Sequence, residues 1–176
     1  MLKRWEKISS KAIHTNPWWT YMLDRFRIPY GIDGEYHYVH TPGSSMVIPV
    51  TGDGKIILVN QYRFLCDKES IEFPCGGVRN GESHASMAAI ELEEETGYRA
   101  GEISKCGEFN PFNGVTDEMC HVFIARSLIK TQSRPDVTEE FELLYCTPVE
   151  IDSMIASNRI WDGMSLAAWS LVKNIL

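Results

Sequence analysis

The chain has 176 residues, 44% of them hydrophobic, and its 24 acidic and 17 basic residues give a net charge of −7. This size and composition indicate one globular domain, and the acidic balance argues against a protein that binds duplex nucleic acid. No apolar run approaches the roughly 20 residues of a membrane span, and the start MLKRWEKISS lacks the apolar stretch of a signal peptide. We therefore expect neither nucleic acid nor membrane as a partner.

The cysteines and histidines give no sign of a zinc site. None of the five cysteines stands in a CxxC pair, and the five histidines show no HExxH or zinc-finger spacing. An odd number of cysteines is typical of reduced thiols in the cytoplasm, where we expect the protein to reside.

Strands are expected in the first part of the chain. Residues 1–43 are rich in tryptophan and tyrosine and fit an N-terminal β-segment, with Pro42-Gly43 as the boundary to a second unit, residues 44–176. Two β-rich runs then flank a Gly-Asp-Gly turn in SSMVIPVTGDGKIILVNQYRF, which is typical of a hairpin.

The remainder of the chain mixes strands and helices. ESIEFPCGGVRNGE predicts a short strand and a glycine-rich loop, and SHASMAAIELEEET predicts a helix over residues 83–96. Strands are expected in AGEISKCGEF, MCHVFIARSL and EEFELLYCTPV, with the turn-rich NPFNGVTDE between the first two. Two helices follow, in VEIDSMIASN and in SLAAWSLVKNIL, the second with Asp162 as a possible N-cap. This order indicates an α+β fold.

The predicted helix over residues 83–96 concentrates negative charge near its C-terminus. At 100 degrees per residue, Glu91, Glu94 and Glu95 fall within a wedge of about 100 degrees, whereas Glu93 points elsewhere. These carboxylates repel one another and face the negative end of the helix dipole. Mg²⁺ or Mn²⁺ would offset both effects, and a solvated acidic surface is the alternative reading.

The whole stretch GGVRNGESHASMAAIELEEETGY, residues 76–98, resembles the Nudix box, the signature of hydrolases that cleave a nucleoside diphosphate linked to another moiety. The positions that match at the right spacing are Gly76, Glu82, Glu91, Leu92, Glu94, Glu95, Gly97 and Tyr98. The resemblance implies a Nudix-type α/β/α sandwich with a mixed β-sheet. It also implies that Glu91, Glu94 and Glu95 are catalytic, metal-binding carboxylates, with the Gly76 carbonyl as a further ligand and Glu82 as a supporting acid.

One position departs from the family pattern. The arginine that precedes the first glutamate of the cluster, and orients the acidic groups in the family, is Ile90 here. An isoleucine cannot donate a hydrogen bond to a carboxylate. Either another cation takes this role, with Arg79, Arg63 and Arg99 as candidates, or the site is less ordered.

The flanking segments VNQYRF, IEFPCGG, GEFNPFNGVTDE and EEFELLYCTPVEI resemble the ADP-ribose and nucleotide-sugar pyrophosphatase branch. In this reading Arg63 binds the diphosphate as a fork, although it could be an ordinary surface charge at the end of a strand. Glu118 would accept a hydrogen bond from a ribose or sugar hydroxyl. Glu72 and Glu139 would join the metal site or activate water, with Glu140 as the alternative to Glu139.

The aromatic residues of the N-terminal segment have two readings. Trp19, together with Trp18 and Tyr21, could stack on a nucleobase across a homodimer, as similar segments do in that branch. Equally, these side chains could pack a small core.

The resemblance implies hydrolysis of ADP-ribose or another nucleotide sugar to a nucleoside monophosphate and a sugar phosphate, with Mg²⁺ or Mn²⁺ lowering the pKa of the attacking water. A nucleotide-binding or regulatory protein with weakened catalysis is the main alternative, and Ile90 is its support. A hydrolase of nucleoside triphosphates or capped RNA is a third possibility, which the acidic net charge and the loop around Pro111 disfavour.

Overall fold

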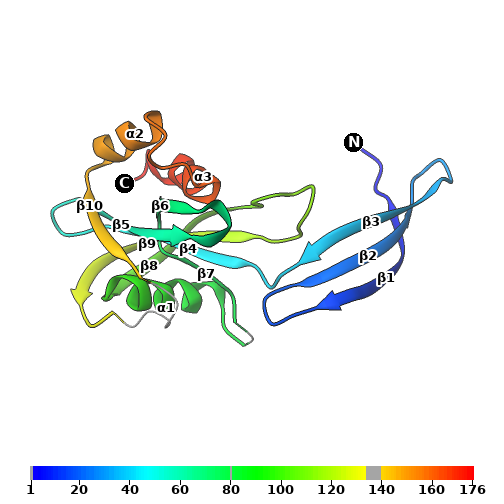
Figure 1. The fold of residues 1–176 in the computed structure, drawn as a ribbon, viewed down its shortest axis with the longest axis horizontal. Coiled ribbons are helices and arrows are strands. Elements are labelled where there is room, and N and C mark those ends of the chain that lie inside the picture. Colours follow the sequence, from blue (N-terminus) through cyan, green and yellow to red (C-terminus); the bar gives the residue numbers. More distant parts are fainter. Residues whose placement is uncertain (1, 80, 134–139) are drawn as a thin grey trace.

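The computed structural model describes residues 2–79, 81–133 and 140–176. Within these ranges the chain forms three β-sheets and three α-helices (Figure 1). None of these helices is long and apolar enough to cross a membrane.

The N-terminal sheet is an antiparallel meander that extends away from the rest of the molecule (Figure 1). Its strands, in the order β1-β2-β3, are β1 (Glu6–Thr15), β2 (Thr20–Arg27) and β3 (Asp33–His40). The predicted N-terminal β-segment is thereby confirmed, whereas its division from the rest of the chain after residue 43 stays a prediction. Every residue of β1 is exposed, so this sheet has little core of its own.

The rest of the molecule contains two further sheets. The first has the order β7-β4-β9-β8, with strands β4 (Ser44–Pro49), β7 (Cys75–Gly77), β8 (Tyr98–Phe109) and β9 (Cys120–Lys130). Because β4 runs parallel to β9 while the other pairs are antiparallel, this sheet is mixed, as predicted. The second has the order β10-β5-β6, with strands β5 (Ile56–Arg63), β6 (Lys68–Glu72) and β10 (Glu142–Cys146).

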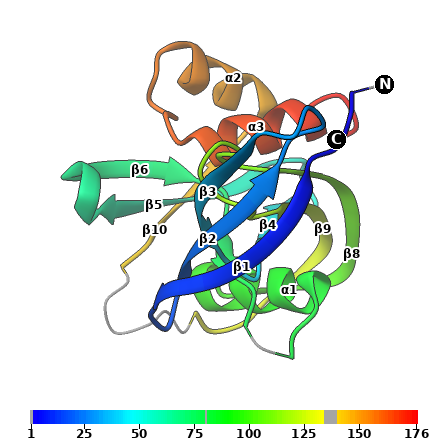
Figure 2. The same cartoon turned by 90° about the vertical axis from the view of Figure 1, so that its right-hand side faces the viewer.

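Helices cover these sheets from opposite sides. α1 (His84–Thr96) lies on one side, and α2 (Pro148–Ala156) and α3 (Gly163–Val172) lie on the other (Figure 1). A short 3₁₀ helix, η1 (Phe64–Cys66), turns the chain between β5 and β6, and this hairpin extends to the side of the molecule (Figure 2). The arrangement confirms the predicted α+β, α/β/α class.

The predicted hairpin between β4 and β5 is wrong in its pairing. The chain does reverse at the Gly-Asp-Gly turn, where Thr51 N donates to Lys55 O at 2.9 Å. The two strands nevertheless enter different sheets and share one isolated bridge, Val50 to Ile56. The reason is that β4 already pairs with β7 along one edge and with β9 along the other.

Alternation along β4 divides the core into two layers. Met46 and Ile48 belong to the large cluster that also contains Trp169 of α3. Val47 faces the other way and packs with Leu92 of α1 in a smaller cluster. The smaller cluster therefore fixes α1 against the sheet, and with it the acidic residues beside Leu92.

Candidate active site

The ends of α1 are fixed by local chemistry. Ser83 is the N-cap and accepts a hydrogen bond from Ser86 N at 3.1 Å. Gly97 ends the helix with φ of 69°, in the left-handed region, as its position after the glutamates predicts. Asp162 likewise caps α3 and accepts from Ser165 N at 2.7 Å.

The acidic residues of α1 are not a solvated face. Glu91 and Glu95 are only 8% and 5% exposed, and Glu94 is partly exposed beside them. Burying carboxylates away from water is unfavourable unless other groups compensate their charge. Their burial therefore distinguishes Glu91 and Glu95 from side chains of a solvated acidic surface.

Gly76 brings the backbone of β7 directly against one of these carboxylates. Ser45 of β4 pairs with Gly76, and a Cβ added at Gly76 would overlap the carboxylate of Glu91. Any residue with a side chain at this position would displace Glu91. Glycine is therefore required at position 76 because the backbone lies so close to the Glu91 carboxylate, and not because of an unusual backbone angle.

The three arginines that the sequence analysis could not rank have different ion-pair partners in the structure. Arg79 Nη2 lies 2.8 Å from Glu94 Oε2 and 3.8 Å from Glu91 Oε1. Arg99 pairs instead with Glu93, at 2.9 Å, away from the three clustered acids.

Arg63 forms a two-point ion pair with Glu72 at the ends of β5 and β6. Arg63 Nε donates to Glu72 Oε1 at 2.8 Å, and Nη2 donates to Oε2. The hydrogen bond to Glu72 raises the pKa of Arg63, and the charge of Glu95 adds to this effect. Glu72 is 4% exposed, whereas the Arg63 side chain remains 46% exposed. Arg63 and Glu72, which the sequence analysis gave separate roles, thus form one ion pair near the acidic face.

The donor chemistry of this face fits a divalent cation. Carboxylate and carbonyl oxygens are the ligands that Mg²⁺ and Mn²⁺ prefer, and the Gly76 backbone lies against Glu91. In the part of the chain that the structure describes, no three acidic, His or Cys side chains converge closely enough to hold a metal ion. The Arg79 guanidinium is the cation seen against Glu91 and Glu94.

The other predicted residues lie at several places. Ser44 Oγ donates to Glu118 Oε1 at 2.6 Å, so Glu118 lies next to the start of β4. Glu82 accepts from Ser86 Oγ at the start of α1. Glu139 falls outside the described residues, and Glu140, which follows it, is exposed.

The N-terminal tryptophans do not pack a core. Trp18 and Trp19, in the turn between β1 and β2, are 76% and 40% exposed. Tyr21 on β2 stacks on His37 of the neighbouring strand, with 5.7 Å between ring centroids. The alternative reading, in which these tryptophans fill a small core, is wrong for Trp18 and Trp19.

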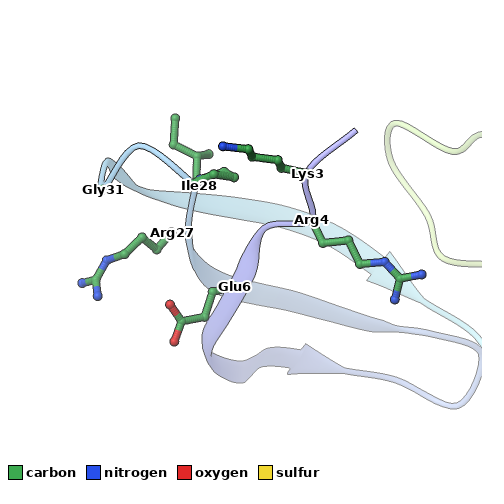
Figure 3. Close-up of a pocket in the computed structure, with 7 residues that line it drawn as sticks. Lys3, Arg4, Glu6, Arg27, Ile28 and Gly31 are labelled. Atoms are coloured by element: carbon green, nitrogen blue, oxygen red, sulfur yellow. The ribbon is translucent and has the colours of Figure 1, made fainter. Parts of the chain in front are cut away.

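A pocket at the outer end of the N-terminal sheet is remote from the acidic face. Lys3, Arg4, Glu6 and Arg27 line it near the turn that contains Gly31 (Figure 3). In both overall views this turn lies far from α1 (Figures 1 and 2).

Two side-chain pairs near the site, formed by partly or fully buried residues, were not predicted from the sequence. The rings of His84 and His121 stack with centroids 3.6 Å apart, and Ser45 Oγ lies 3.0 Å from His84 Nδ1. A hydrogen bond with Cys120, together with burial, raises the pKa of the Cys75 thiol well above its usual range. His84 begins α1 and Cys75 lies on β7, whereas His121 and Cys120 lie on β9, so both pairs join segments that are far apart in the sequence and that no local sequence signal connects.

Residues 40–166 match the family model described as NUDIX domain. The chain is 32% identical to the ADP-ribose pyrophosphatase of Bacillus subtilis (strain 168) over 148 residues, which are 83% of this chain and 80% of that protein. It is also 32% identical, over the same shares, to the methanol dehydrogenase activator of Bacillus methanolicus. A crystal structure of an ADP compounds hydrolase superposes with a TM-score of 0.86 at 16% identity and covers 99% of this chain and 95% of that one, which supports the fold.

Proposed function

The chain belongs to the Nudix family, and we propose that it hydrolyses the pyrophosphate bond of a nucleoside diphosphate linked to a sugar, with ADP-ribose as the first candidate. The products would be a nucleoside monophosphate and a sugar phosphate. The observation that carries this proposal is the burial of Glu91 and Glu95 beside Glu94 on one face of α1. The name of the Bacillus subtilis relative supports the choice of ADP-ribose.

In this proposal Glu91, Glu94 and Glu95, with the Gly76 carbonyl, hold Mg²⁺ or Mn²⁺. A divalent cation at this face would supply charge neutralisation for the diphosphate and a bound water of lowered pKa. Hard oxygen ligands suit either ion, so both belong in the assay.

The remaining roles follow from exposure and contacts. Arg63 keeps half of its side chain exposed while it holds Glu72, so its free N–H groups can donate to diphosphate oxygens. Glu118 serves a ribose or sugar hydroxyl, and the exposed Trp19 stacks on a base. Glu139 remains our candidate for the group that activates water.

We also propose that the protein is a cytoplasmic homodimer joined through the N-terminal sheet. Apolar side chains are exposed in this N-terminal region, among them Trp5, Ile8 and Ile13. Residues 1–43 hold six of the 17 Lys and Arg residues but only four of the 24 Asp and Glu residues. This basic segment complements the acidic remainder of a second copy.

The test is the release of nucleoside monophosphate from ADP-ribose, GDP-mannose and UDP-glucose, each with Mg²⁺, with Mn²⁺ and with EDTA. We expect release from at least one compound that depends on the metal. Binding of these nucleotides without release from any of them would favour the alternative, a regulatory Nudix protein. One relative at 32% identity is named a methanol dehydrogenase activator, so the regulatory alternative can be tested as activation of another enzyme.

A further inference from the structure

We propose that Arg79 is the positioning residue of the acidic face, in the role that the Nudix pattern gives to an arginine at the position of Ile90. The inference rests on the proposed function and deepens it. It concerns how Glu91 and Glu94 are held, not which groups they bind.

The backbone around Arg79 is fixed on both sides. Val78 N donates to Gly43 O at 2.9 Å, and Glu82 N donates back to Arg79 O at 3.1 Å. These two hydrogen bonds restrain the main chain next to Arg79. The Arg79 side chain extends to α1 and places Nη2 2.8 Å from Glu94 Oε2.

The other two candidate arginines form ion pairs with other glutamates. Arg63 holds Glu72 across the β5–β6 hairpin, and Arg99 holds Glu93. Ile90 has no donor. Of the three arginines weighed from the sequence, Arg79 is the one that forms ion pairs with two of the clustered acids, Glu91 and Glu94.

The contacts of Arg79 have two physical consequences: they favour turnover, and they weaken the binding of a metal ion. A guanidinium bonded to Glu94 Oε2 restricts the rotation of that carboxylate, so the other oxygen keeps a defined direction. The same positive charge repels a second cation at the site. Loss of Arg79 should therefore slow turnover, because Glu94 is less well placed, and strengthen metal binding, because a competing charge is gone.

The ion pair itself contributes little to folding. The Arg79 and Glu94 side chains are 55% and 35% exposed, and pairs this exposed have small effects on stability. Effects of Arg79 substitutions on turnover are thus separable from unfolding, which circular dichroism would monitor.

The experiment compares Arg79→Ala, Arg79→Lys and the double variant Arg79→Ala/Ile90→Arg with Arg99→Ala as the matched control. Arg99 forms a similarly exposed pair with Glu93 of the same helix, with side chains 66% and 32% exposed. The readouts are kcat and KM for ADP-ribose and, on protein without substrate, the Kd of Mn²⁺ from the electron paramagnetic resonance of the free ion.

We expect Arg79→Ala to lower kcat by about tenfold to a hundredfold and to bind Mn²⁺ about fivefold more tightly. Arg79→Lys should keep near wild-type Mn²⁺ affinity while kcat falls, because the charge remains but the fork is lost. Ile90→Arg in the Arg79→Ala background should restore most of kcat, and Arg99→Ala should change neither quantity.

Wild-type kcat and wild-type Mn²⁺ affinity in Arg79→Ala would overturn the inference, and so would equal losses in Arg99→Ala. Failure of Ile90→Arg to restore kcat would overturn the equivalence of the two positions. If the wild-type protein released no monophosphate, the proposed hydrolase function would fail, whereas the Mn²⁺ measurements would still decide the role of Arg79.

Discussion

The N-terminal sheet and the catalytic core both bury acidic side chains, but they compensate them differently. Asp24 of β2 is 7% exposed and is bonded by Lys7 and by Ser10 Oγ within the same sheet. Burial raises the pKa of Asp24, but the bonds from Lys7 and Ser10 outweigh it and lower that pKa. Within its own sheet, Asp24 is thus compensated by the charge of Lys7 and by hydroxyl donors.

The core instead gathers Glu91, Glu94 and Glu95 on one face of α1, and the cation seen there is Arg79. Asp24 is thus compensated within its own sheet, whereas we propose that the acidic face of α1 holds an additional cation.

The largest expected effect concerns catalysis. Glu94→Gln should lower kcat by a factor on the order of 10² to 10³, the size of loss seen when one group that stabilises transition-state charge is removed. The unfolding temperature should stay close to that of the wild type because Glu94 is partly exposed. Asp24→Asn is the matched control in the N-terminal sheet and should leave kcat unchanged; a fully active Glu94→Gln would refute the ligand assignment.

The next effect concerns stability. Leu92→Ala should cost about 2–5 kcal/mol of unfolding free energy, because Leu92 is fully buried against Val47 and Phe123. Ile13→Ala on β1, where the side chain is 45% exposed, should stay within about 0.5 kcal/mol. Urea unfolding of dilute protein measures the unfolding free energy of both variants. Equal losses in the two variants would contradict the expected difference between the core and the N-terminal sheet.

Self-association should depend on the sheet rather than on the core. Ile13→Glu should weaken dimerisation by about tenfold or more, because a charge enters an apolar contact. Leu65→Glu, at the 95% exposed tip between β5 and β6, should leave the association unchanged. Sedimentation velocity over a concentration series would show this, and a monomeric wild-type protein would contradict the proposed dimer.

The smallest expected effect is a pH dependence of the core. Burial and the positive charges of His84 and Lys105 lower the pKa of His121 below its ordinary 6.5, and Glu108 opposes this. The unfolded chain therefore binds more protons than the folded one, so stability should fall as pH drops through 6.5. His121→Gln should reduce the fall in melting temperature between pH 7.5 and 5.5. An unchanged fall in melting temperature would show that His121 does not contribute to this pH dependence.

Much of the fold could be predicted from local sequence. The helix with its glutamates, its end at Gly97 and the N-cap at Asp162 follow from short-range chemistry that the sequence displays. The pairing of β4 could not be predicted in this way, because its partner β9 comes more than 70 residues later in the chain.

The same limit applies within the candidate site. The side chains of Arg63 and Glu72 meet only through the register of β5 and β6. The choice of Arg79 over Arg63 and Arg99 depends on the path of the loop before α1, which residue types alone do not fix.

The most direct test of the central claim is a Mn²⁺ titration of the wild-type protein and of Glu94→Gln, with and without ADP-ribose. We expect the wild type to take up Mn²⁺ that Mg²⁺ displaces, and Glu94→Gln to bind it at least about tenfold more weakly. If the wild-type protein took up no Mn²⁺ even with ADP-ribose present, the acidic face of α1 would not be a cation site, and the account would be contradicted.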